Sequence, residues 1–232
     1  MYDLYANVIK QQAIDIDGLC SLRQKLSRDG RAIRVTDLGA GSAHMPNSAR
    51  KISDILRYTT TPHKFSSLYS RIIGHYKFRT IIELGTSFGI NAIYLSKVSG
   101  DVSITTFEGS DAIAQVAKSL FRENDIKNIR LIEGNIDETL APYLDTIDQL
   151  DFALIDANHR FEPTMRYLEL LTKKIHAHSV VAVDDIHASS EMERAWLAIQ
   201  NHPRVQATVD LHRCGLVFFN PSLTRQNVVL QF

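Results

Sequence analysis

Apolar residues recur along this chain in two patterns, one at helical spacing and one as short, nearly unbroken runs typical of buried strands. From residue 64 onward the two patterns alternate. They predict helices over 64–77, 90–98, 111–124, 137–144, 163–176 and 190–201, and strands over 79–84, 102–108, 129–133, 151–156 and 179–184. Strands that alternate with helices indicate parallel pairing and right-handed crossovers. The predicted fold is therefore α/β, with a doubly wound, mostly parallel sheet.

The C-terminal part of the chain departs from this alternation. Two strand-like runs, 205–211 and 216–219, are separated by four residues with no helix between them. A hairpin is the simplest connection, so we expect an antiparallel edge. Together with the five earlier strands, this hairpin makes a sheet of seven strands.

The last predicted helix, 190–201, has clear sequence signals at both ends. Ser190 and Glu193 form a capping-box pair, and Pro203 follows the helix. Its inner stripe is expected to consist of Met192, Ala195, Trp196 and Ile199.

Residues 1–63 show a different organisation and are expected to form a mainly helical N-terminal extension to a domain over 64–232. Apolar residues at near-helical spacing predict one or two short helices in the first 30 residues, and a further helix is predicted over 48–58. The apolar residues of the first 30 are Leu4, Val8, Ile9, Leu19, Leu22 and Leu26. This extension could cap the domain or form a homodimer interface.

Composition narrows the class of protein. With 26 basic and 26 acidic residues among 232, the chain carries no charge excess that would favour nucleic acid or an acidic membrane surface. Cys20 and Cys214 are too few for a disulfide framework and form no C-x-x-C pair. No apolar run is long enough for a membrane span, and the first residues do not resemble a signal peptide. We expect a cytoplasmic protein.

A glycine-containing loop follows the first predicted core strand. Glu83 precedes Gly85-Thr86-Ser87-Phe88-Gly89, and Ile90 and Asn91 open the next helix. The two glycines allow a sharp turn and close approach of a ligand, and N–H groups at the helix start can donate to it. The spacing matches neither G-x-G-x-x-G nor a P-loop. A nucleotide-like ligand with hydroxyl or cationic groups is expected.

A second glycine loop, Asp37–Ser42, looks much the same but lacks a following strand that ends in an acid. We interpret it as a structural turn in the N-terminal extension. The alternative is a contact with substrate or with a second subunit.

Acidic residues also end the later strands. Glu108 ends the second core strand, about 25 residues after Glu83, where an acid in nucleotide-binding folds accepts hydrogen bonds from ribose. The alternative is that Glu108 caps the helix at 111. Asp156 follows one later strand, and Asp184 and Asp185 follow the next. Clustered carboxylates suit Mg²⁺ or Ca²⁺, although they could instead border the ligand and cap a loop.

The pattern E-x-G-x-x-x-G from Glu83 to Gly89 resembles motif I of the class I S-adenosylmethionine-dependent methyltransferases, especially the catechol O-methyltransferase-like group. The resemblance covers about residues 64–220. It implies S-adenosylmethionine as cofactor and places Asn135 and Ile136, after the third strand, beside its adenine. The residues it assigns to the cofactor are Glu83, Gly85, Thr86, Ser87, Gly89, Asn91, Glu108, Asn135, Ile136 and Asp156.

The same resemblance suggests a metal site and a base. Metal ligands in that group are Asp, Asp and Asn, where this chain has Asp156, Asp184 and Asp185. A lysine base often stands three residues after the first of these ligands, and His159 takes that place here. An imidazole could accept a hydroxyl proton near neutral pH, or it could simply hydrogen-bond a loop. His187 is a second candidate for base or metal ligand.

The function expected from these residues is O-methylation of a small molecule with the help of Mg²⁺ or another divalent cation. Two alternatives stay open at this point: a metal-independent methyltransferase of the same fold, and a non-catalytic module that binds the cofactor or a protein. No G-x-S-x-G elbow or recognisable nucleophilic cysteine supports a hydrolase.

Overall fold

The computed structural model describes residues 2–12, 18–36 and 47–232, which form two compact units. The first unit contains residues 1–79 and 86–135, and the second contains residues 80–85 and 136–232. The second glycine loop, Asp37–Ser42, lies outside the described residues. The boundary expected at residue 63 stays a prediction, since the first unit holds the N-terminal segment together with the helices and strands that follow.

The first unit begins with short helical elements. These are α1 (Tyr2–Leu4), the π-helical turn η1 (Tyr5–Ile9), α2 (Leu19–Ser27), α3 (Ile52–Thr59) and α4 (His63–Tyr76), with β1 (Ala32–Arg34) paired antiparallel to β2 (Ala49–Lys51). The six apolar residues expected to face inward in the first 30 are all buried. The helix predicted over 48–58 starts later, because residues 49–51 form β2.

The remainder of this unit alternates as predicted. It contains α5 (Ile90–Ser96), β4 (Ser103–Glu108), α6 (Asp111–Glu123) and β5 (Ile129–Glu133). Strands β4 and β5 are parallel, and Glu108 lies opposite Glu133 in their register. The loops after these two strands therefore leave from the same end.

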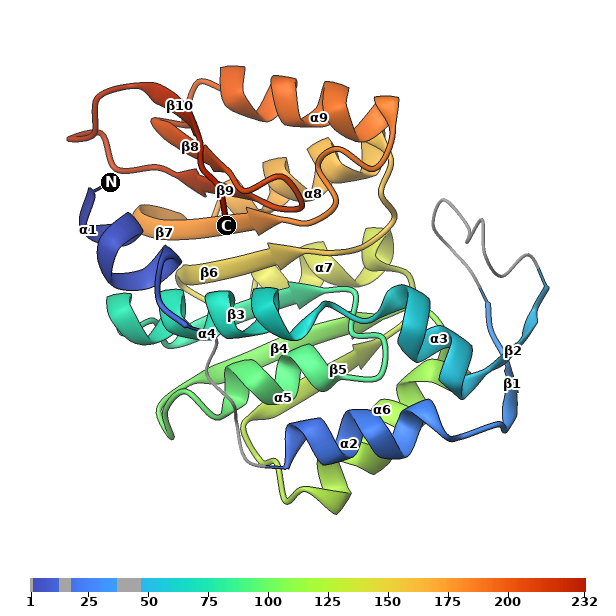
Figure 1. Cartoon of the computed structure of the whole chain (residues 1–232). Helices are drawn as coiled ribbons and strands as arrows, with labels where there is room; N and C mark the ends of the chain where they lie inside the picture. The colour runs from blue at the N-terminus through green and yellow to red at the C-terminus, as the bar shows by residue number, and fades with distance from the viewer. Residues whose placement is uncertain (1, 13–17, 37–46) are drawn as a thin grey trace. The chain divides into compact units, whose positions relative to one another are not determined.

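The second unit holds six strands in the order β10-β8-β9-β7-β6-β3. Its elements are β3 (Thr80–Leu84), α7 (Ile136–Leu144), β6 (Leu150–Ile155), α8 (Phe161–Thr172), β7 (Ile175–Val183), α9 (Ser190–Asn201), β8 (Ala207–Asp210), β9 (Gly215–Phe218) and β10 (Gln226–Val229). Strands β3, β6 and β7 are parallel, while β9 runs antiparallel to both β7 and β8. Figure 1 shows the hairpin β8–β9 beside β10 and α9.

The predicted fold class is confirmed, with mostly parallel strands, flanking helices and an antiparallel C-terminal hairpin. Two details were wrong. In the described chain the strands β3 to β10 number eight rather than seven, because β10 has only four residues and lacks an apolar run. The helix predicted to end at residue 176 ends at Thr172, and β7 begins at Ile175.

The apolar stripe of helix α9 faces inward, as predicted, and Trp196 contacts strand β9. Met192, Ala195, Trp196 and Ile199 are all buried. Gly215 of β9 lies so close to the Trp196 ring that a Cβ there would sit 2.3 Å from a ring carbon. The helix cap was misplaced by one residue, because Ser189, and not Ser190, accepts the hydrogen bond from the Met192 N–H.

Candidate active site

Three neighbouring parallel strands of the second unit, β3, β6 and β7, end at the same level of the sheet. Leu84 of β3 pairs with Ile155 of β6, and Ile155 pairs with Val183 of β7. The residues that follow, Gly85, Asp156 and Asp184, therefore leave the sheet at the same edge. In α/β sheets this carboxyl edge is where ligands bind.

Gly85 lies against the backbone of the neighbouring strand end. The Asp156 N–H donates to the Leu84 carbonyl at 2.9 Å, and a Cβ on Gly85 would lie 2.1 Å from the Asp156 carbonyl oxygen. Gly85 also has φ +102°, which favours glycine. Glu83, two residues earlier, is buried within β3.

The rest of the glycine loop belongs to the first unit and is joined covalently to Gly85. Its Thr86 N–H donates to the Phe107 carbonyl at 3.0 Å, and the Thr86 and Thr106 hydroxyl oxygens are 2.6 Å apart. Gly89 has φ +74° and leaves no room for a Cβ, which would meet the Phe121 ring at 2.4 Å. These contacts hold the loop against the end of β4.

Glu108 is the anchor of this loop. One carboxylate oxygen accepts the Ser87 N–H and the other accepts the Ser110 N–H, both at 2.9 Å. Ser87 has φ +47°, a left-handed conformation that costs free energy in a non-glycine residue and is common at ligand sites. The acid predicted to face the glycine loop is thus in direct contact with it.

The other residues assigned to the cofactor lie in α5, in the loop after β5 and at the start of α7. Asn91 is buried within α5. Asn135 is half-buried in the loop after β5, where the preceding Gly134 N–H donates to the Glu108 carbonyl at 2.9 Å. Ile136 is a buried residue at the start of α7.

The three carboxylates of the predicted metal site lie near one another in the second unit. The Asp184 side chain is fully buried, whereas Asp156 and Asp185 are half-buried. Burial first, and the Asp156 and Asp185 carboxylates next, raise the pKa of Asp184 to about 8, although the Arg213 guanidinium opposes this shift. Within the described residues, no group of three or more His, Cys, Asp and Glu side chains is arranged to hold a metal ion.

Arg213 is the residue that sequence reasoning missed. Its Nη2 lies 2.8 Å and its Nε 3.2 Å from Asp184 Oδ2, and Nη2 lies 3.4 Å from Asp185 Oδ1. Partial burial lowers the pKa of Arg213, but the Asp184 carboxylate outweighs this effect and the net shift is upward. In the sequence Arg213 was only part of a hairpin turn, because no local pattern reports a partner 29 positions away.

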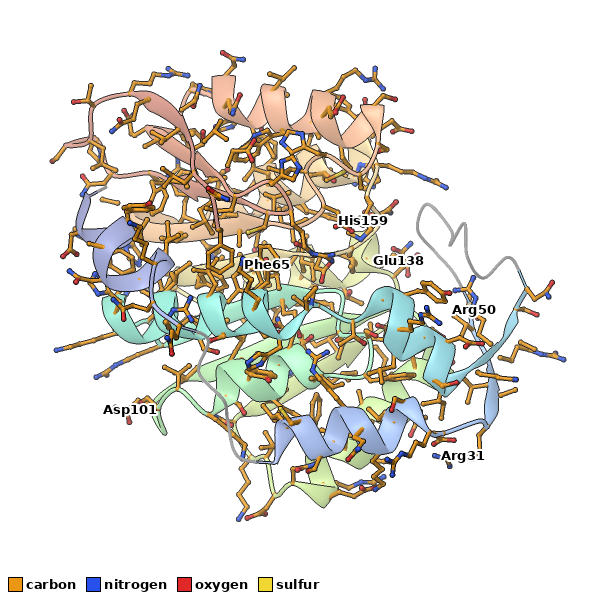
Figure 2. All side chains as sticks on the ribbon, in the orientation of Figure 1. Arg31, Arg50, Phe65, Asp101, Glu138 and His159 are labelled. Atoms are coloured by element: carbon orange, nitrogen blue, oxygen red, sulfur yellow. The ribbon has the colours of Figure 1, made fainter. Side chains whose placement is uncertain are left out.

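The two histidine candidates have different partners. His159 lies on the loop between β6 and α8 (Figure 2), with Nε2 3.6 Å from Asp156 Oδ1. Both Asn158 and His159 have positive φ. His187 is instead held by the hairpin, with Nε2 2.8 Å from Asp210 Oδ2. The geometry thus associates His159, and not His187, with a carboxylate of the predicted site.

Comparisons with known proteins agree with this architecture. Residues 82–186 match the family model described as a methyltransferase domain. The similar solved structures include the S-adenosylhomocysteine-bound methyltransferase PaMTH1 of Podospora anserina, with 14% identity, a TM-score of 0.68, and coverage of 94% of this chain and 95% of that one. No curated protein sequence matches this chain.

Two further solved structures are O-methyltransferases. TomG of Streptomyces achromogenes, involved in tomaymycin synthesis and solved with S-adenosylmethionine, has 16% identity and a TM-score of 0.67, covering 94% of this chain and 96% of its own. The Bacillus cereus O-methyltransferase in complex with S-adenosylhomocysteine has 16% identity and a TM-score of 0.63, with coverage of 94% and 95%.

The fold is that of the class I methyltransferases. Residues 82–186, which include the glycine loop and the Asp184–Asp185 pair, match the model of a methyltransferase domain.

Proposed function

We propose that this protein transfers a methyl group from S-adenosylmethionine to an oxygen atom of a small molecule. The observation that carries the proposal is the bond from the Ser87 N–H to Glu108, which joins the glycine loop to the expected ribose acid. The family match and the cofactor-bound methyltransferases among the similar structures support the same cofactor.

The residues of the glycine loop fit such a cofactor. Gly85 has φ +102° and packs against the Asp156 backbone, so the loop turns at the end of β3 without a side chain at this position. A carboxylate oxygen can accept more than one hydrogen bond, so Glu108 could bind ribose hydroxyls as well as the Ser87 and Ser110 N–H groups. Glu108 would therefore hold the ribose hydroxyls while it holds the loop.

When bound, S-adenosylmethionine would supply a methyl group for transfer to the acceptor oxygen, and its sulfur would keep the electrons of the carbon–sulfur bond that breaks. His159 would take the hydroxyl proton of the acceptor. Its Nε2 faces Asp156, so Nδ1 is the nitrogen that would accept the proton, and Asp156 would stabilise the imidazolium. Most of the rate acceleration would come from positioning.

The divalent cation expected at Asp156, Asp184 and Asp185 fits this arrangement poorly. The Arg213 guanidinium already donates twice to Asp184 and pairs with Asp185. A dication beside a permanently charged guanidinium would be repelled. The second candidate function, a metal-independent methyltransferase of the same fold, is therefore favoured by a specific contact.

A calorimetric titration with S-adenosylhomocysteine tests the proposed function. It is run once with Mg²⁺ and once with EDTA, on protein shown to be folded. We expect micromolar binding in at least one condition. Folded protein that binds in neither condition would contradict the proposed cofactor.

A further inference from the structure

A positively charged side chain of this protein, Arg213, lies beside the carboxylates at the ends of β6 and β7. Asp156 and Asp184 leave adjacent parallel strands, and the Asp184 N–H donates to the Ile155 carbonyl at 2.9 Å. Asp185 follows with φ +54°, an uncommon conformation for a non-glycine residue. Three carboxylates so placed repel one another, so a positive charge nearby stabilises their ionised forms.

Arg213 is held in place by backbone contacts as well as by its ion pairs. It lies between β8 and β9, and β9 pairs with β7 so that Gly215 lies opposite Val183. The Ile186 N–H donates to the Arg213 carbonyl at 3.1 Å, which ties the turn to the loop after Asp185. The Arg213 backbone is therefore fixed beside the loop after β7, and the contacts with Asp184 and Asp185 hold the guanidinium among the carboxylates.

The charge of Arg213 acts on all three carboxylates. It donates two N–H groups to the fully buried Asp184, lies within ion-pair distance of Asp185 and interacts electrostatically with Asp156. An arginine guanidinium keeps its charge at every physiological pH and cannot serve as a base. Asp184 Oδ2 accepts both of these hydrogen bonds, so a metal ion at this oxygen would have to compete with the guanidinium.

We propose that Arg213 replaces the divalent cation at this cluster and that the protein binds its cofactor and acts without a metal. This inference rests on the proposed function, and it assigns Arg213 the role of a positioning residue. The guanidinium holds Asp184 and Asp185 in place. Its side chain is 35% exposed, so it can also present positive charge to an acceptor oxygen.

The test measures metal binding and cofactor binding separately. Mn²⁺ is titrated into the wild-type protein while thermal unfolding is followed, and S-adenosylhomocysteine is titrated in EDTA and in Mg²⁺. We expect no Mn²⁺-dependent shift of the melting temperature, and Kd values for S-adenosylhomocysteine that agree within about twofold between the two conditions.

Removing the Arg213 guanidinium should allow the neighbouring carboxylates to bind a metal ion. Arg213→Ala leaves the Asp184 and Asp185 carboxylates uncompensated, which should lower the melting temperature by about 10 °C, and Mn²⁺ should then raise it again. Arg194→Gln removes one positive charge from the exposed side of α9, where Arg194 lies over the Phe161 ring, and should respond to Mn²⁺ no more than the wild type does.

Two results would overturn the proposal. One is a saturable Mn²⁺ effect on the wild type that Asp184→Asn abolishes, which needs no folded Arg213 variant. The other is a folded Arg213→Ala protein that shows no response to Mn²⁺. Failure of the proposed function has a different signature, because wild-type protein would then bind S-adenosylhomocysteine neither in EDTA nor in Mg²⁺.

Discussion

Glu108 shows how one side chain can both shape a loop and prepare it for a ligand. Its two oxygens each accept a backbone N–H, from Ser87 and from Ser110. A carboxylate has no donor, so both contacts are favourable and charge-assisted. An amide at this position would turn an NH₂ group toward one of the two N–H donors.

We therefore expect Glu108→Gln to weaken binding of S-adenosylhomocysteine by about 10- to 100-fold, the range expected for hydrogen bonds to a charged group. Calorimetry measures the change. Glu123→Gln is the matched control, because Glu123, on α6, forms an exposed ion pair with Lys25 of α2. If the Glu108 variant and the wild type bind S-adenosylhomocysteine with equal affinity, Glu108 does not belong to the cofactor site.

Gly85 gives a second prediction for a single residue. Alanine there would adopt φ +102° and place its Cβ 2.1 Å from the Asp156 carbonyl oxygen. Strain and overlap each cost about 1–3 kcal/mol, so Gly85→Ala should lower the melting temperature by at least about 5 °C. It should also weaken cofactor binding.

Gly100→Ala is the control for this change, since a Cβ at Gly100 has open space around it. Thermal unfolding of the two variants side by side checks the prediction. If the Gly85 and Gly100 variants melt together, the backbone beside Asp156 is not as close as the structure shows.

At the scale of the element, α9 illustrates how a cap depends on local geometry. Both Ser189 and Ser190 are acceptable N-cap residues by type. In the structure Ser189 has extended backbone angles and its hydroxyl accepts the Met192 N–H at 3.2 Å, while Ser190 is already inside the helix.

Ser189→Ala should therefore lower the free energy of unfolding by about 1 kcal/mol, and Ser190→Ala by much less. Denaturant unfolding of both variants measures the difference. A larger loss of unfolding free energy for Ser190→Ala than for Ser189→Ala would show that Ser190 is the N-cap residue, as the sequence predicts.

The C-terminal hairpin is the element whose position matters most for the site. It carries Asp210, which pairs with His187, and Arg213, which pairs with Asp184. Antiparallel pairing of β9 with β7 fixes where these side chains meet the loop after β7. A shift of one residue in this register would turn the side chains of β9 to the opposite face.

At the scale of the whole molecule, the structure bears on assembly through the apolar residues of the N-terminal segment. Leu4, Val8, Leu19, Leu22 and Leu26 are buried within their own chain. A second protein chain is therefore not needed to cover these side chains.

No helix in the part of the chain that the structure describes is both long and apolar enough to cross a membrane.

Homodimer formation through the N-terminal helices stays a hypothesis, and we expect it to be weak because the five leucine and valine side chains named above are already covered. Sedimentation velocity over a range of concentrations checks this. A mass near 26.2 kDa at micromolar concentration is the expected result. A stable species of twice that mass at the lowest concentration would contradict this prediction.

The sequence by itself determined the alternation of strands and helices, the glycine loop and the acid at Glu108. These features depend on local periodicity and on spacing along the chain, which a sequence states directly. The prediction that Glu108 lies beside the glycine loop agrees with the hydrogen bond that Glu108 accepts from the Ser87 N–H.

Tertiary structure alone decided the short strand β10, the start of α9 and the partner of Asp184. Each depends on packing or register between segments far apart in the chain, as with Arg213 and Asp184, which are 29 positions apart. The three aspartates look like a metal site in the sequence because their residue types suit one. The fold places a guanidinium among them, and its positive charge would repel a dication.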